Sequence, residues 1–75
     1  MRLSDLKIGQ QARIRAILTG DQTYRDKLIA MGLLPGTLLK VLRIAPLGDP
    51  LMIQIRGVAL SLRKKEAMIL QLEEV

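Results

Sequence analysis

Short runs in which every second residue is aliphatic recur along nearly the whole chain, and this alternation limits what the chain can fold into. Residues 12–18, 37–44 and 68–73 each follow the pattern once, and residues 51–63 follow it twice around a central turn. Alternation with a period of two is typical of strands that have one buried face. In a chain of 75 residues, long enough for one domain (residues 1–75), the pattern predicts an all-β domain of five short strands.

The clearest strand pair is the hairpin over residues 51–63. A two-residue loop at Arg56-Gly57 gives three opposed pairs that are all aliphatic: Ile55 with Val58, Ile53 with Leu60, and Leu51 with Leu62. A shift by one residue would turn the apolar face to water, so these pairs set the register. Arg-Gly is not a preferred hairpin turn, and a bulge at this turn is therefore an alternative.

In the other runs the alternation assigns each aliphatic side chain to a face. The predicted face of residues 12–18 holds Ala12, Ile14, Ala16 and Leu18, and that of residues 68–73 holds Met68, Leu70 and Leu72. In residues 37–44, Leu39 and Val41 share one face, and Leu38, Leu42 and Ile44 share the other with Lys40. Both faces of that strand are partly apolar, so one meets the core and the other meets the helix or a partner.

Residues 23–31 interrupt the strand pattern and predict a short helix. Tyr24, Leu28 and Met31 are spaced at i, i+4 and i+7 and therefore share a face. The predicted boundaries are an N-cap at Asp21 or Thr23, a left-handed C-cap at Gly32 and a type II turn at Pro35-Gly36. A second interruption at residues 63–66 predicts one turn of 3₁₀-helix before the last strand.

Five short strands, one helix after the first strand and one helical turn before the last predict an SH3-like five-stranded small barrel. An OB-fold is the alternative, because it also combines five strands with a helix. The OB-fold normally places its helix later and uses longer strands. Leu, Ile and Val must fill the interior, since the chain has no Phe, no Trp and one Tyr.

The residue inventory predicts that the protein is not an enzyme. It has no His and no Cys, which removes the usual general base, the thiol nucleophile and the common ligands of transition metals. Its carboxylates form no recognisable catalytic pair, and its glycines form no phosphate-binding loop. We therefore expect no catalytic residues, no metal site and no cofactor.

The net charge of +5, from 12 Lys+Arg against 7 Asp+Glu, favours an acidic partner. Nucleic acid fits that charge, but Tyr24 is the only aromatic residue on which a base could stack, so we expect no specific nucleic-acid binding. Residues 28–34 form the longest nearly apolar run, far shorter than the ~20 residues that span a bilayer. With no targeting segment visible, we expect a cytoplasmic protein that does not insert into the membrane.

The helix end and the following turn, residues 28–36, are more apolar than one end of a small barrel needs. This excess predicts a docking patch for a partner protein, with Met31 and Leu33 exposed, Arg25 and Lys27 at its rim, and Leu28 on its core side. The alternative is that the segment only closes the barrel end. The proline-containing loop of residues 45–50, with Leu47 and Asp49, is the second candidate. Self-association through the same patch stays open.

Four segments of the chain resemble the FeoA family of the bacterial ferrous iron transport (Feo) system. They are LSDLKIG (3–9), the segment from Lys27-Leu28 to MGLLPG (27–36), APLGDP (45–50) and VALSLRKKEA (58–67). The resemblance implies an SH3-like fold and a cytosolic accessory role in iron uptake through binding to the membrane transporter FeoB. The protein would then be peripheral to the inner membrane through its partner. The family offers no catalytic, cofactor or metal residues. The alternative is a basic nucleic-acid-binding module or an SH3-like module of an iron repressor.

Overall fold

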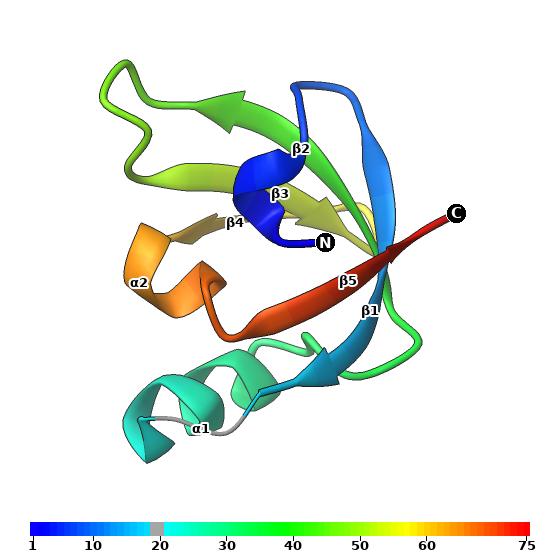
Figure 1. The fold of residues 1–75 in the computed structure, drawn as a ribbon, viewed down its shortest axis with the longest axis vertical. Coiled ribbons are helices and arrows are strands. Elements are labelled where there is room, and N and C mark those ends of the chain that lie inside the picture. Colours follow the sequence, from blue (N-terminus) through cyan, green and yellow to red (C-terminus); the bar gives the residue numbers. More distant parts are fainter. Residues whose placement is uncertain (19–20) are drawn as a thin grey trace.

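The computed structural model describes residues 1–18 and 21–75, and within them five strands form one antiparallel sheet (Figure 1). The elements follow the chain as η1 (Leu3–Asp5, a 3₁₀-helix), β1 (Gln11–Ile17), α1 (Gln22–Ala30), β2 (Leu38–Ile44), β3 (Leu51–Ile55), β4 (Val58–Leu62), α2 (Lys64–Ala67) and β5 (Leu70–Glu74). The predicted fold class, five short strands with one helix after the first strand, is confirmed.

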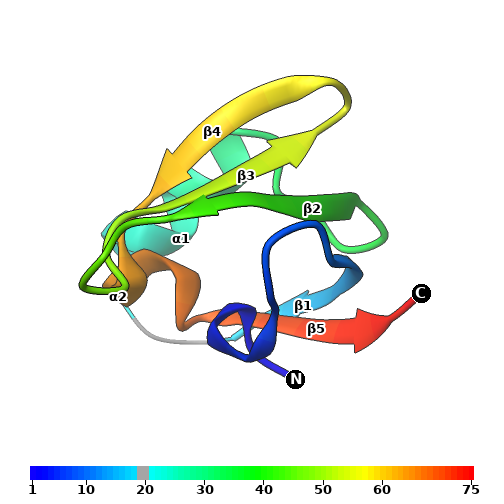
Figure 2. The same ribbon diagram turned by 90° about the horizontal axis from the view of Figure 1, so that it is seen from above.

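The strand order is β4-β3-β2-β1-β5, so β4 and β5 form the two edges of the sheet. The sheet curls strongly but does not close into a barrel. Figure 2 shows β4 at one margin of the sheet and β5 at the other, with α2 leading from the first to the second. The 3₁₀-helix η1 lies beside β5, and the carbonyl of Met1 accepts a hydrogen bond from the Leu72 N–H (2.9 Å). The N-terminal segment therefore covers the β5 edge.

The core lies inside this curl and is entirely aliphatic. Its largest fully buried side chains come from all parts of the described chain: Leu3, Ile14, Leu28, Leu33, Leu39, Val41, Ile53, Leu62 and Leu70. Most of them stand at alternate strand positions, as the sequence pattern predicts. Leu3 and Leu6, from the segment around η1, were not anticipated as core residues and are also buried.

The predicted hairpin register is confirmed in full. Ile55 pairs with Val58, Ile53 with Leu60, and Leu51 with Leu62. No bulge occurs at the turn, because Arg56 (φ 49°) and Gly57 (φ 77°) both adopt left-handed backbone conformations, as a two-residue type I′ turn requires. Val58 is 56% exposed, whereas its partner Ile55 is buried in the core, because β4 is an edge strand.

Helix α1 ends in a Schellman motif around Gly32, which takes the predicted left-handed conformation (φ 88°). The Leu33 N–H donates to the Leu28 carbonyl, and the Gly32 N–H donates to the Ile29 carbonyl, both at 3.0 Å. At the other end Asp21 is the N-cap, since its side chain accepts from the Thr23 N–H (2.8 Å). The helix is thus fixed at both ends by local hydrogen bonds.

Two register shifts differ from the simple alternation predicted for β1 and β2. One lies between Ile14 and Ala16, and after it Ile17 packs against the core. The other lies between Val41 and Arg43, and after it Ile44 packs against the core that holds Leu39 and Val41, not on the opposite face with Lys40. A bulge adds one residue to a strand and exchanges its faces beyond that point, so the face assignments after residues 15 and 42 were wrong.

The segment between β4 and β5 also differs from the prediction. Residues 64–67 form the α-helical turn α2 in place of a 3₁₀ turn. Met68 follows it and is 54% exposed, so it does not share the buried face of Leu70 and Leu72. The side chain of Glu66 accepts from the Arg63 N–H (2.9 Å), which stabilises the first turn of α2 and delays the start of β5 to Leu70.

Candidate docking groove along strand β4

The predicted docking patch divides into buried and accessible residues. Leu28 and Leu33 are both fully buried. Burial was expected for Leu28, but the prediction that Leu33 is exposed is wrong. The Schellman motif gives the reason, because its final residue normally makes an apolar contact with the residue five positions earlier. The hydrogen bond between Leu33 and Leu28 brings the two side chains into the same core.

Met31 lies at the surface, half-buried, where the end of α1 approaches the β3–β4 hairpin. A hollow of about 150 Å³ opens there, and its lining is Met31, Gly32, Ile55, Arg56, Val58 and Leu60. The lining is mostly apolar, and Val58 is largely exposed within it. A methionine side chain is flexible and adapts to differently shaped apolar groups. The hollow is therefore suited to an aliphatic side chain of a partner.

Lys27 lies one helical turn before Met31 and borders a second hollow. This hollow measures about 500 Å³ and is lined by Lys27, Asp49, Pro50, Ser61, Arg63 and Glu66. The Lys27 ammonium and the Glu66 carboxylate form an ion pair (2.5 Å) that joins α1 to α2. Lys27 is 48% exposed, whereas the Glu66 side chain is almost fully buried. The second hollow is thus polar and charged, in contrast to the first.

The charge of Glu66 is maintained despite its burial. Burial by itself raises the pKa of this carboxyl, but the hydrogen bond and charge of Lys27, the Arg63 N–H and the charge of Arg63 together outweigh it. The net result is a pKa below the ordinary value for Glu. Glu66 is therefore ionised at neutral pH and holds α1, α2 and the end of β4 together.

The remaining predicted residues lie in different places. Arg25 is half-buried, and its guanidinium donates to the Ile17 carbonyl (3.1 Å), so it ties α1 to β1. Asp49 accepts a hydrogen bond from the Lys64 N–H (3.0 Å) and borders the polar hollow. Leu47 is 94% exposed in the loop between β2 and β3 and lines neither of the two hollows.

Both hollows border β4, the apolar one beside the end of α1 and the polar one beside Lys27, α2 and the β2–β3 loop, and together we call them the β4 groove. Its residues are Lys27 and Met31 on α1 and its exit, Val58, Leu60 and Ser61 on β4, and Arg63 after it. Sequence reasoning found the α1 side and missed the β4 side. The signal available was the run VALSL, which has no charge although Arg56 precedes it and Arg63-Lys64-Lys65 follows it.

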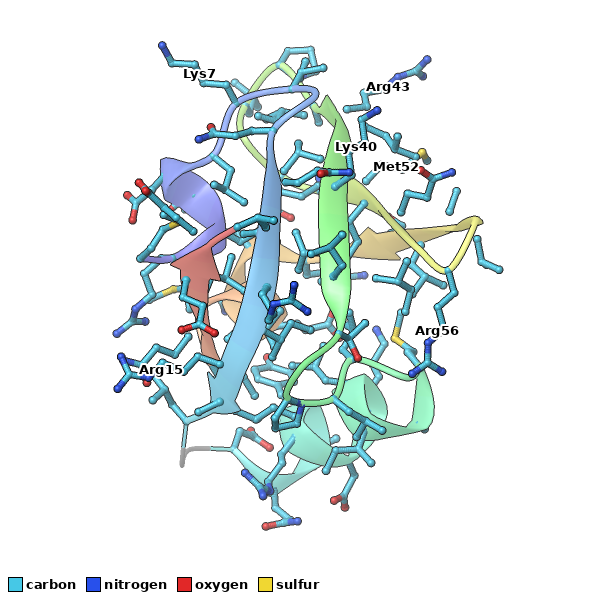
Figure 3. The ribbon with its side chains drawn as sticks, turned by 90° about the vertical axis from the view of Figure 1, so that its right-hand side faces the viewer. Lys7, Arg15, Lys40, Arg43, Met52 and Arg56 are labelled. Atoms are coloured by element: carbon cyan, nitrogen blue, oxygen red, sulfur yellow. The ribbon has the colours of Figure 1, made fainter. Side chains whose placement is uncertain are left out.

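A second accessible surface is the outward face of β2 and β3, shown in Figure 3. Lys40 and Arg43 project there near Met52, which is 37% exposed, and Arg56 lies farther along, toward α1. A shallow hollow of about 590 Å³ on this side is bordered by Lys40, Gln54 and Arg56. Within residues 1–18 and 21–75 the only ion pair is Lys27–Glu66, so these cations have no carboxylate partner there. The face complements an acidic surface.

In the part of the chain that the structure describes, no three His, Cys, Asp or Glu side chains are grouped as a metal site. An open, curled antiparallel sheet of five short strands, with one helix after the first strand and an apolar groove at one edge, defines a small SH3-like domain. The FeoA domain model matches residues 1–74, and the chain belongs to this family.

Two relatives of the chain are named for ferrous iron transport. The Fe(2+) transport protein A/Fe(2+) transporter FeoB fusion protein of Porphyromonas gingivalis is 36% identical over 73 residues, which is 97% of this chain and 8% of that protein. Iron(II) transport protein A of Clostridium thermocellum is 37% identical, with a TM-score of 0.91 over all of this chain and 46% of that one. The chain thus spans less than half the length of either relative.

More distant structures share the fold alone. A Stenotrophomonas maltophilia FeoA complexed with zinc, described as a procaryotic SH3 domain protein, has a TM-score of 0.83 at 22% identity, over 97% of this chain and 89% of that one. A manganese-dependent transcriptional repressor has a TM-score of 0.92 at 16% identity, over 100% and 36%. Among the described residues, no helix combines the length and apolar character that a membrane span requires.

Proposed function

We propose that this protein is a non-catalytic accessory protein of ferrous iron uptake that binds the cytosolic part of a FeoB-type transporter. The observation that carries the proposal is the P. gingivalis relative, in which Fe(2+) transport protein A and FeoB are fused in one chain. Fusion holds two domains at a high effective concentration, which favours an interaction that separate chains would make by association.

The geometry of the protein supports a binding role. The β4 groove combines an apolar hollow with a charged one, and the outward face of β2 and β3 carries cations without carboxylate partners among the described residues. Interfaces of this kind use a small apolar centre and a polar rim. An acidic surface on the transporter would complement the net charge of +5. Binding to it would place the protein in the cytoplasm, at the inner membrane through its partner.

The test is capture of a detergent-solubilised FeoB-type transporter by the immobilised protein, paired with ferrous iron uptake in cells that lack the accessory protein. We expect specific capture that weakens as salt is raised, and restored uptake when the gene is supplied. Met31→Gln should weaken capture, because it places an amide in the apolar hollow. The matched control is Met68→Gln, which alters a 54% exposed methionine that lines neither hollow of the β4 groove. Absence of capture together with unchanged uptake would overturn the proposal.

A further inference from the structure

We propose that the β4 groove binds an extended acidic segment of a partner protein as an added strand paired with β4. In this arrangement an aliphatic side chain of the segment occupies the hollow beside Met31, and carboxylates at its ends face Arg56 and Arg63. The inference rests on the proposed function in one respect, since it takes the segment to belong to the FeoB-type transporter.

The first step is the position of the backbone groups of β4. The strand forms one edge of the sheet, and among residues 1–18 and 21–75 it pairs with β3 alone. After a two-residue turn, residues that flank the turn form a hydrogen-bonded pair, and such pairs then alternate along the strands. Val58, Leu60 and Leu62 therefore bond to β3. The N–H and C=O groups of Ala59 and Ser61 are directed away from the sheet, and both residues are exposed.

The second step is that β4 has none of the usual protections of an edge strand. Proteins discourage strand addition with charged side chains, prolines or bulges at an exposed edge. The sequence of β4, VALSL, contains no charge and no proline. Its register with β3 is continuous from Val58 to Leu62, without a bulge. The edge is therefore uninterrupted by a bulge and uncharged, which leaves it open to pairing with another strand.

The third step concerns the side chains that the groove can accept. A strand added to β4 would lie about 4.8 Å from it, with alternate side chains on opposite faces. One set would then meet Met31, Val58 and Leu60, which line the apolar hollow. That hollow of about 150 Å³ is mostly apolar and has room for one aliphatic side chain. The segment should thus have aliphatic residues at alternate positions.

The fourth step is charge, which also decides between a partner and a second copy. Arg56 lies before β4 and Arg63-Lys64-Lys65 follow it, and within the described chain none of these side chains forms an ion pair. Two copies paired antiparallel through β4 would place the Arg56 end of each beside the Arg63-Lys64 end of the other. Like charges opposed across strands are destabilising. The same cations attract an acidic segment, so such a segment is favoured over a second copy of the chain.

The experiment uses the full chain and a synthetic peptide, acetyl-Glu-Val-Thr-Val-Thr-Val-Glu-amide, observed by amide NMR and hydrogen exchange. We expect the amide protons of Ala59 and Ser61 to shift and to exchange at least ~10-fold more slowly in the complex, since they become hydrogen-bonded. The same peptide with Lys at both ends should bind at least ~10-fold more weakly. N-methylation of the residues whose amides face β4 should abolish binding.

The decisive variant is Ala59→Pro, with Ala59→Thr as its matched control. Proline removes the outward N–H but leaves the β3 ladder intact, and an edge strand tolerates it. Threonine changes the same side chain and keeps the N–H. We expect at least ~10-fold loss of peptide affinity for proline and less than ~2-fold change for threonine. Ser61→Pro repeats the test at the second outward position, and thermal melts confirm that each variant is folded.

The outcomes separate this inference from the proposed function. Peptide binding that leaves Ala59 and Ser61 exchange unchanged, or that survives in folded proline variants, overturns strand addition. Protection of these amides at high protein concentration without peptide indicates a second copy and also overturns it. Transporter capture that is insensitive to Ala59→Pro overturns strand addition and leaves the proposed function standing. Peptide binding at β4 without transporter capture and with unchanged iron uptake supports the groove chemistry and overturns the proposed function.

Discussion

The two edges of the sheet are treated in opposite ways. At β5, the Met1 carbonyl accepts from the Leu72 N–H, and the strand ends with Glu73 and Glu74. At β4, the part of the chain that the structure describes contributes no such cover, and the strand is uncharged. A small sheet that leaves both edges open invites aggregation. The difference supports our proposal that β4 binds a partner, because only the β5 edge is covered by another part of the described chain.

The variant with the largest expected effect on stability tests the β5 edge, which the N-terminal segment covers. Leu3→Ala removes a fully buried side chain from the segment that covers β5, and we expect it to cost about 2–5 kcal/mol of unfolding free energy. Urea melts measure the cost, and hydrogen exchange should show a less protected Leu72 amide. The control at the other edge is Val58→Ala, where a 56% exposed side chain should change stability by only ~0.5 kcal/mol. Equal effects at the two edges would contradict the contrast.

The second prediction separates the two residues once assigned to one patch. Leu33→Gln places an amide in the core, and we expect a loss of about 2 kcal/mol or more. Met31→Gln alters a half-buried side chain of the β4 groove, and we expect a loss of about 1 kcal/mol or less together with weaker transporter capture. Thermal melts beside capture assays measure both. If Met31→Gln unfolds the protein, Met31 belongs to the core. If the folded variant captures the transporter as the wild type does, Met31 takes no part in binding.

The third prediction concerns Glu66, which lies on α2 between the two edges. Its pKa is lower in the folded protein than in the unfolded chain, so the unfolded state takes up the proton first as pH falls. The stabilisation is complete above the unfolded value of about 4.3, and it is lost as pH falls through the lower folded value. Glu66→Gln should cost about 1–3 kcal/mol at pH 7 and flatten this acid dependence in melts taken between neutral and acidic pH. Glu74→Gln, at the exposed end of β5, is the control and should do neither.

The variant with the smallest expected effect on stability gives the open β4 edge a charge that protects it against strand addition. Ser61→Glu places on β4 a charge of the kind that blocks strand addition, and this charge has the same sign as the ends of the acidic peptide. We expect stability to change by only ~0.5 kcal/mol, since Ser61 is exposed, while peptide affinity falls at least ~10-fold. Ser61→Thr is the control and should bind normally. Unchanged peptide binding by Ser61→Glu would show that β4 is not the pairing strand.

The hairpin was predictable residue by residue because one two-residue loop fixes every partner beyond it. Only one register pairs Ile53 with Leu60 and Leu51 with Leu62. The bulges in β1 and β2 were not predictable in this way. They occur at Arg15 and Leu42, where no glycine or proline marks them, and they depend on how neighbouring strands fit the curl of the sheet.

The candidate site was predictable on the helix side and not on the strand side. The burial of Leu33 could have been inferred, because a glycine C-cap brings the next residue back onto the helix. The position of β4 at an open edge could not have been inferred, because it depends on the strand order β4-β3-β2-β1-β5. That order arises from long-range packing. The run VALSL shows that the strand is uncharged, but not that it lies at an edge of the sheet.

The hairpin turn has a consequence for how the protein could be stabilised. Arg56 holds a left-handed backbone conformation (φ 49°) that glycine and asparagine adopt more easily. An engineer seeking thermostability would choose Arg56→Asn or Arg56→Gly and would expect a gain of up to about 1 kcal/mol. The same change would delete a cation at the mouth of the β4 groove. At this position a screen for heat resistance would select variants with weakened partner recognition, because robustness and recognition place opposite demands on one residue.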